Sequence, residues 1–184
     1  PFFTEGAGIF DFGRRGQTQL FYSRRIGLGS GGSPIPLQAG ARLTGRLGAQ
    51  QLGLITTHTG GEDPATAVVG RVKRDVLGRG YIGAMGTLHA PQGEAQTAAG
   101  GLDVNLPYVV RDQNLVFIGA AAVDGSATSG DPVYARGMID FPNDIADIAL
   151  RFERVGEGFR PDLGFVQQRG VTRLSWQTEL TPRP

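Results

Sequence analysis

The chain has 184 residues, of which 18 are basic and 17 acidic, so its formal net charge is +1. No basic run is longer than two residues, which argues against a nucleic-acid-binding surface. Cysteine is absent, so disulfides and cysteine-ligated metals are excluded. A chain of this length predicts a single domain.

Nothing in the sequence resembles a membrane-spanning helix, which needs about 18 consecutive apolar residues. No basic stretch followed by an apolar stretch marks a secretion signal at the start. Because the sequence begins at Pro1 rather than at methionine, we expect it to be an excised or processed part of a longer protein.

Residues 1–19 form an aromatic and glycine-rich block, and half of the ten phenylalanines lie within the first 21 residues. Burial of one such ring contributes about 1.5 to 3 kcal/mol, and protein surfaces avoid exposed apolar patches. We therefore expect this block to pack on the domain formed by residues 20–184. The expected anchors are Phe2, Phe3, Phe10 and Phe12. The alternative is an aromatic girdle at a membrane interface.

The rest of the chain predicts an all-β fold. Extended strands are expected over residues 20–26, 39–48, 50–59, 65–76, 80–90, 96–106, 114–124, 132–141, 145–155 and 170–180. Most have the length of a tilted membrane-crossing strand, about 9 to 11 residues, rather than the usual about 5 to 6. We predict an antiparallel meander of about 8 to 10 long strands, closed or partial as a transmembrane-type β-barrel. A helix over 143–155 is the one alternative that the apolar spacing allows.

Along these strands charged residues alternate with small or aliphatic residues, so the two kinds point to opposite faces. In residues 68–75 the two sets are Val68, Gly70 and Val72, and Arg71, Lys73 and Asp75. Such alternation gives each strand one apolar face. That face points to the core in a soluble protein and to lipid in a membrane barrel. Tight connections, as at 48–50, alternate with longer polar ones, as at 60–64 and 124–131, which is typical of membrane barrels and of many sandwiches.

We expect the charged parity to form a paired network in a polar lumen, since buried charges need partners. The expected members are Arg42, Arg46, Arg71, Asp103, Arg136, Asp140, Asp147, Arg151, Glu153, Arg173 and Glu179. The residues expected on the opposite side are Leu43, Val72, Ile139, Leu150 and Trp176. Seventeen of the 18 basic residues are arginine, which suits pairing with carboxylates but can equally reflect the nucleotide composition of the source genome.

Several blocks of the sequence resemble a known family. They are PFFTEGAGIFDFG at 1–13, LFYSRRIG at 20–27, GARLTGRLG at 40–48, VGRVKRDVLGR at 69–79 and FRPDLGFVQQRGVTR at 159–173. The chain is similar to the start of the barrel region in a bacterial family of uncharacterised outer-membrane-type β-barrel proteins. In that family an N-terminal sandwich similar to family 9 carbohydrate-binding modules usually precedes the barrel. The resemblance implies an outer-membrane location, lipid as a partner, glycan contact through an upstream domain, and no established catalytic residues.

Motifs for other chemistry are weak. His58 and His89 lie on separate predicted strands without a partner at metal-ligand spacing. The glycine-rich run at 27–32 lacks the ending of a phosphate loop, and the acidic stretches at 62–63 and 124–131 fit no defined calcium loop. No carboxylate pair stands out for glycoside hydrolysis, and no serine lies in a nucleophile motif. We expect neither catalytic residues nor a metal or cofactor.

The first functional hypothesis is a bacterial outer-membrane β-barrel, or its N-terminal portion, that serves as an envelope or transport component and not as an enzyme. Residues 1–19 would then pack against the barrel mouth or inside the lumen. The rival is a soluble β-sandwich or lipocalin-like module that binds carbohydrate or a small ligand, or a non-catalytic part of a glycoside hydrolase. The two hypotheses differ in whether Arg42, Arg71 and Arg151 are enclosed or solvated.

Overall fold

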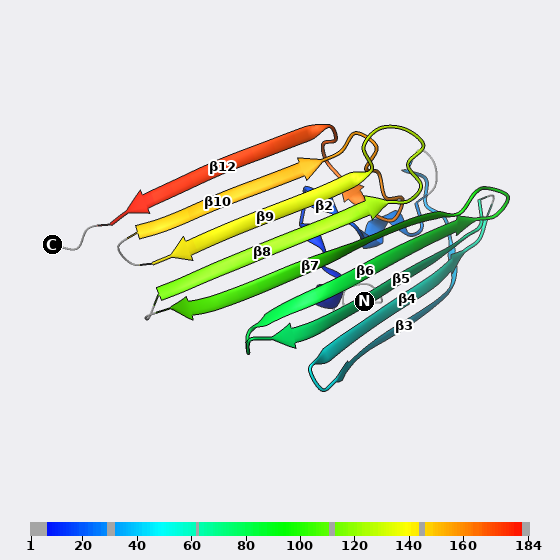
Figure 1. The fold of residues 1–184 in the computed structure, drawn as a ribbon. Coiled ribbons are helices and arrows are strands. Elements are labelled where there is room, and N and C mark those ends of the chain that lie inside the picture. The colour runs from blue at the N-terminus through cyan, green and yellow to red at the C-terminus, as the bar shows by residue number, and fades with distance from the viewer. Residues whose placement is uncertain (1–6, 29–31, 62, 111–112, 144–145, 182–184) are drawn as a thin grey trace.

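The computed structural model describes residues 7–28, 32–61, 63–110, 113–143 and 146–181, and its regular structure is almost entirely β (Figure 1). The main sheet contains nine strands in the order β12-β10-β9-β8-β7-β6-β5-β4-β3. These strands are β3 (Leu37–Leu47), β4 (Gln50–Thr59), β5 (Ala65–Val76), β6 (Gly80–Pro91), β7 (Thr97–Val110), β8 (Gln113–Asp124), β9 (Val133–Pro142), β10 (Ala146–Val155) and β12 (Val171–Leu180). All neighbours pair antiparallel, so the predicted all-β meander of long strands is confirmed.

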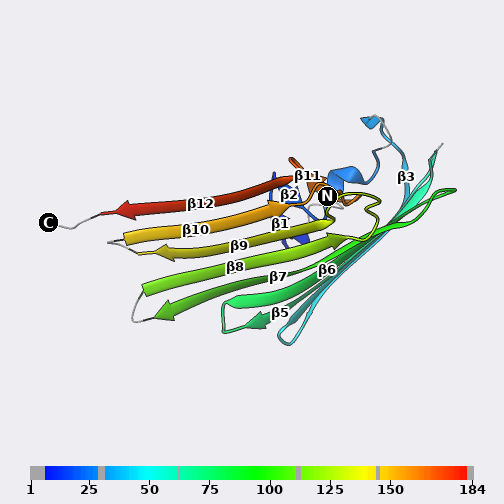
Figure 2. The ribbon, with the colours of Figure 1, turned by 45° about the horizontal axis from the view of Figure 1, so that its top comes forward.

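The main sheet is curved but not closed, and β3 and β12 are its two edges (Figure 2). Residues 7–28, here called the N-terminal segment, lie against one face of this sheet, which we call the inner face. The opposite face is the outer face. Directly paired residues on neighbouring antiparallel strands point to the same face. The inner face therefore includes the paired row Gly53, Arg71, Met85 and Gly101.

Most predicted strand bounds lie close to the observed ones, and those of β4 and β5 coincide with the prediction. The strand predicted over 20–26 is wrong, because a 3-10 helix, η2 (Ser23–Arg25), lies there and the main sheet begins at Leu37. The strand does not form because this stretch contacts residues that are distant in the sequence. The Tyr22 backbone N–H donates to the carbonyl of Leu163 at 2.7 Å, and Leu20 is buried in the core rather than paired in a strand. The alternative helix over 143–155 does not form, since β10 occupies most of that range.

The hydrophobic core lies between the inner face and the N-terminal segment. Its buried members are Phe10, Phe12, Leu20, Phe21, Ile55, Ala67, Val69, Met85, Ala99, Ala122, Tyr134, Val155, Phe159 and Leu163. A small second sheet joins β1 (Gly13–Arg14), β2 (Thr18–Gln19) and β11 (Phe165–Val166), and so ties the connection between β10 and β12 to the N-terminal segment. Segments far apart in sequence thus cover the inner face together.

The connections at the two ends of the main sheet differ in length. At one end, the turn end, short connections such as 48–49 and 77–79 join β3 to β4 and β5 to β6. At the other, the loop end, longer connections such as 125–132 and the stretch 156–170 join β8 to β9 and β10 to β12. None of the helices within the described ranges is long and apolar enough to cross a bilayer.

Candidate functional site on the inner face

All the charges predicted for the network lie on the inner face. Register pairs form one cross-strand row of Arg46, Gln51, Lys73, Gly83, Asp103, Ala120, Arg136, Glu153 and Arg173. The other predicted charges are an even number of residues away from a member of this row on the same strand, and so share its face: Arg42, Arg71, Asp140, Asp147, Arg151 and Glu179. By the same parity Leu43, Val72, Ile139, Leu150 and Trp176 lie on the outer face.

The centre of the site is a buried ion pair between β5 and β7. Arg71 Nη1 donates to Asp103 Oδ1 and Arg71 Nη2 donates to Asp103 Oδ2, both at 2.7 Å. The two side chains are only 0% and 7% exposed. Gly83 makes room for this pair, because a Cβ on that residue would lie 2.6 Å from Asp103 Oδ1 and 2.8 Å from Arg71 Nη1. Two parallel charge-assisted bonds fix the orientation of the guanidinium plane.

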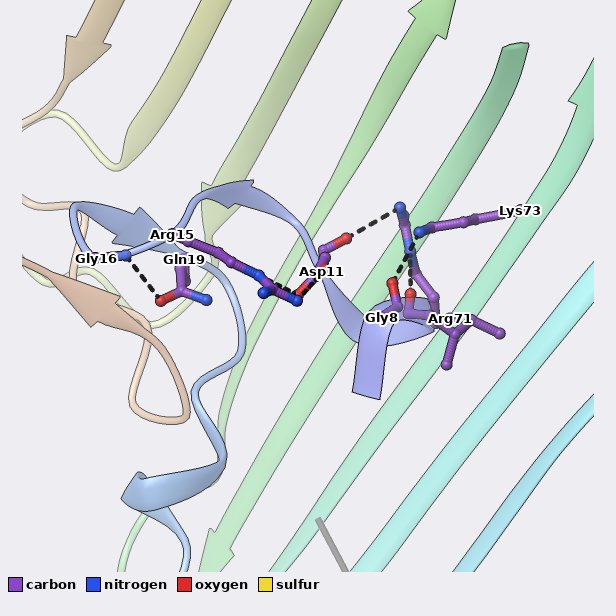
Figure 3. Close-up of polar contacts among 8 residues, drawn as sticks. Gly8, Asp11, Arg15, Gly16, Gln19, Arg71 and Lys73 are labelled. Atoms are coloured by element: carbon purple, nitrogen blue, oxygen red, sulfur yellow. Dashed lines mark hydrogen bonds and ion pairs between the residues drawn. The ribbon is translucent and has the colours of Figure 1, made fainter. Parts of the chain in front are cut away.

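The remaining donors of this arginine hold the N-terminal segment (Figure 3). Arg71 Nε donates to the carbonyl oxygen of Ile9 at 3.3 Å, and Arg71 Nη2 donates to that of Asp11 at 3.4 Å. Lys73 Nζ donates to the carbonyl oxygen of Gly8 at 3.2 Å. Farther along the sheet, Arg136 Nη1 donates to the carbonyl oxygen of Gly13 at 3.1 Å. Strand cations therefore satisfy main-chain acceptors of the N-terminal segment in the short 3-10 helix η1 (Ala7–Phe10), at Asp11 and in β1.

Two of the four predicted aromatic anchors pack beside these contacts. Phe10 and Phe12 are buried in the core, and cation–π contacts place Arg42 over Phe10 and Arg71 over Phe12, each 5.6 Å from the ring centroid. Gly53 allows the approach of Phe10, because a Cβ there would lie 2.8 Å from Phe10 Cζ. The other two predicted anchors, Phe2 and Phe3, lie outside the described residues.

The rest of the predicted charges form smaller groups. Arg173 Nη1 donates to Glu153 Oε2 at 3.2 Å, whereas Arg151 Nη1 donates to Gln177 Oε1 at 3.3 Å rather than to a carboxylate. Within the described ranges no ion pair involves Asp140, Asp147 or Glu179. Of the predicted charges, Arg42, Arg71 and Arg136 thus contact the N-terminal segment, whereas Arg151, Glu153 and Arg173 form separate groups between β10 and β12.

Two charged residues and the main-chain acceptors of the site were missing from the predicted set. Lys73 and Asp75 have the same parity as Arg71, so the strand pattern could have included them. Asp75 pairs with Arg46 on the inner face near the turn end. The carbonyl groups of the N-terminal segment carry no side-chain signal, so their role could not be read from the sequence.

The N-terminal segment crosses the inner face from the turn end to the loop end. The carbonyl of Gly8 is held by Lys73, which lies near the end of β5 that leads into the turn at 77–79. At the loop end the backbone of Tyr22 is bonded to Leu163, and the Ile35 N–H donates to the carbonyl of Gly27 just before β3 begins. The first strand of the sheet therefore starts at the end opposite to Gly8.

Two carboxyl groups in the loops at the loop end are held in their ionised form. A hydrogen bond from Arg154 and a second from the backbone N–H of Val133 lower the pKa of Asp131. The pKa of Asp162 is lowered first by the neighbouring His89 and then by the hydroxyl of Thr97, which donates to it at 2.6 Å. These carboxylates anchor the loops that cover the inner face.

The arrangement is suited to holding a peptide segment inside a curved sheet, because its donors point at main-chain oxygens. Bidentate pairing fixes the orientation of Arg71, and its guanidinium lies over the ring of Phe12. No protein-family model matches the chain, and neither a curated protein nor a solved structure matches it.

Proposed function

We propose that the chain forms part of a transmembrane β-barrel in a bacterial outer membrane and serves as an envelope or transport component rather than as an enzyme. The observation that carries this proposal is the burial contrast between strand neighbours. Arg71 is 1% exposed on the inner face, and Val72 beside it is 47% exposed on the outer face. Large exposed residues recur across the outer face: Leu43, Leu47, Leu52, Leu54, Ile82, Leu102, Phe117, Ile139, Leu150, Phe152, Leu174, Trp176 and Leu180. A water-soluble surface avoids exposing so many large apolar side chains on one face, whereas lipid would cover them.

The dimensions of the sheet support the same proposal. Its strands have 10 to 14 residues, and a tilted strand needs about 9 to 11 to cross a bilayer. Outer-membrane barrels combine short periplasmic turns with longer extracellular loops. The turn end would accordingly face the periplasm, and the loop end would face the exterior.

The two unpaired edges of the sheet indicate that a closed barrel would need further strands. Unpaired N–H and C=O groups of β3 and β12 cannot remain exposed to lipid, so further strands must pair with both edges. The first and last of nine antiparallel strands run parallel to each other, so an odd number of additional strands would close an antiparallel barrel. We assign these strands to the same protein, in keeping with the similarity of the chain to the start of a barrel region.

The N-terminal segment acts in this proposal as an internal plug. Its carbonyl groups are held by Arg71, Lys73 and Arg136, and its rings fill the space above Gly53. A segment so anchored would limit passage along the inner face. The protein would contact outer-membrane lipid, and contact with glycan would belong to an upstream carbohydrate-binding domain, as the resemblance implies.

The rival hypothesis of a soluble sandwich or lipocalin-like module places the aliphatic face inside. The exposure of that face and the enclosure of Arg71 favour the membrane barrel. Sided labelling tests the choice, because the 184 residues contain no cysteine, so labelling above that of the parent protein comes from the introduced thiol. Thr128→Cys lies in the loop 125–132 and Ala49→Cys in the turn 48–49, and both positions are exposed.

In intact bacteria that express the full-length protein, an impermeant maleimide should label Thr128→Cys and leave Ala49→Cys unlabelled. Both variants should react once the outer membrane is opened. Equal labelling of the two thiols in intact cells, or recovery of the protein in the soluble fraction without detergent, would contradict a membrane-crossing sheet.

A further inference from the structure

A cavity of about 310 Å³ lies at the loop end, away from the Arg71 site. Its floor is formed by the inner face of β4, β5 and β6, and its walls by the segment 25–28 and the loop around Leu163. Register pairs connect Thr57 on β4, Ala67 on β5 and His89 on β6 in one row. The small Ala67 side chain between the two polar residues leaves the space open. Neighbouring strands lie about 4.8 Å apart, so the backbones of Thr57 and His89 are separated by roughly 10 Å.

Two polar atoms in this cavity have no hydrogen-bond partner within the described part of the chain: Thr57 Oγ1 and His89 Nδ1. Thr57 is only 2% exposed, so bulk water does not solvate its hydroxyl. His89 Nδ1 lies 3.6 Å from Asp162 Oδ2, which is an ion-pair distance but too long for a hydrogen bond. A buried polar group without a hydrogen-bond partner is destabilising, so a ligand that bonds to these two atoms would gain binding free energy.

The charges around the cavity define the chemistry of that ligand. The lining contains the carboxylates of Asp63, Glu94 and Asp162 and the single guanidinium of Arg25. Arg25 Nε already donates to the carbonyl of Gly164 at 3.2 Å. Without a ligand, a proton on His89 Nδ1 faces Asp162. When a cationic donor enters between the two side chains, the Nε2-protonated tautomer of His89 presents Nδ1 as an acceptor, and the hydroxyl of Thr57 can also accept. The cavity therefore offers acceptors and excess negative charge, which favours a positively charged donor and disfavours an anion.

We propose that this cavity binds a small soluble organic cation, with one ammonium group between His89 and Asp162 and a second hydrogen-bonding group at Thr57. An ammonium group carries three donors, so it can bond to His89 Nδ1 and Asp162 Oδ2 together. Its chain would lie over Ala67, next to the apolar side chains of Ile26 and Leu163. This site goes beyond the barrel proposal and does not depend on membrane insertion.

Calorimetry with three molecules of equal chain length tests the proposal: 1,4-diaminobutane, the neutral 1,4-butanediol and the anionic succinate. The full chain is used in nonionic detergent micelles, and retention of the fold is followed by circular dichroism. The diamine should bind saturably, the diol at least about tenfold more weakly, and succinate not at all. Equal binding of the diol would overturn the cationic assignment, and absence of saturable diamine binding would overturn the site.

Two variants with matched controls locate the binding. Thr57→Val keeps the side-chain shape and removes the hydroxyl, so it tests the location of the site directly. Asp162→Asn removes the charge and also loosens the loop around Leu163 that forms one wall of the cavity. Each should weaken diamine binding about tenfold or more, because hydrogen bonds to charged groups are the stronger class. Thr56→Val changes the adjacent outer-face residue, and Asp131→Asn changes a loop carboxylate outside the cavity lining, so both should bind as wild type. Diamine binding that Thr57→Val and Asp162→Asn leave unchanged would place the site elsewhere and contradict the proposal.

Discussion

Arg71 and Asp103 form a bidentate ion pair with both N–O distances at 2.7 Å, on strands separated by β6, and neither side chain is more than 7% exposed. Gly83 on β6 leaves the space through which the pair forms. The same guanidinium reaches two carbonyl groups of the N-terminal segment. One residue therefore joins the wall of the sheet to the segment that covers it.

Removal of this arginine should be costly. Arg71→Leu leaves the Asp103 carboxylate buried without its partner, and we expect the free energy of unfolding to fall by about 3 to 5 kcal/mol. Arg46→Leu is the matched control, because Arg46 pairs with Asp75 on the same face but is 61% exposed, and such pairs contribute about 0 to 1 kcal/mol. Denaturant titration of the protein in micelles measures both. A similar fall in the free energy of unfolding in the two variants would show that the inner face is accessible to solvent.

The close approach of Phe10 to Gly53 gives a test of the plug. Gly53→Ala would place a Cβ 2.8 Å from Phe10 Cζ and 3.2 Å from Ile9 Cγ2, so it should loosen the N-terminal segment and cost about 1 to 3 kcal/mol. Gly70→Ala lies on the outer face with no atom within 4 Å of its Cβ, and should change stability by no more than about 1 kcal/mol.

Two measurements compare Gly53→Ala with Gly70→Ala: the protease sensitivity of residues 7–28 and the conductance of the protein in planar bilayers. Gly53→Ala should speed cleavage of the segment and raise the current, and Gly70→Ala should do neither. If the two variants behave alike in both assays, the segment neither plugs nor braces the sheet.

Much of the main sheet could be predicted from the sequence, because the period of two is a local property. The alternation around Arg71 and Val72 placed them on opposite faces, and the ends of β4 and β5 were set by nearby glycine and proline. The local alternation also shows which residues lie on the charged face of each strand, although Lys73 and Asp75 were left out of the predicted network.

What could not be predicted depends on contacts between distant residues. The strand expected over 20–26 fails because Tyr22 bonds to Leu163, far along the chain. The acceptors for Arg71 are backbone carbonyl groups of Ile9 and Asp11, which no side-chain pattern reveals. The cavity beside His89 likewise appears only when the loop around Asp162 folds over the strand ends.

Acid should release that loop. The pKa of Asp162 lies below its ordinary value because of His89 and Thr97, so the folded state favours the ionised carboxylate. The resulting stabilisation is fully present above the ordinary carboxyl pKa of about 4 and is lost as the pH falls through the lower pKa of the folded state. Hydrogen exchange of residues 156–164 should accelerate over that range. In Asp162→Asn the exchange should already be fast at neutral pH and change little on acidification, whereas an unchanged acid response would assign it to another group.

The central claim is that the outer face contacts lipid, and the single tryptophan reports on it directly. Trp176 lies on the outer face of β12, is 76% exposed, and donates its indole N–H to Thr178 Oγ1 at 2.6 Å, so this donor is satisfied without water. Ser175 is the adjacent residue on the inner face.

The measurement is quenching of tryptophan fluorescence by brominated phospholipids in reconstituted vesicles, for the wild type and for the double variant Trp176→Phe, Ser175→Trp. If the outer face contacts lipid, Trp176 should show strong quenching and blue-shifted emission, and the indole moved by one residue should be quenched much more weakly. Red-shifted emission from Trp176 that brominated lipid does not quench, or equal quenching at both positions, would contradict that contact.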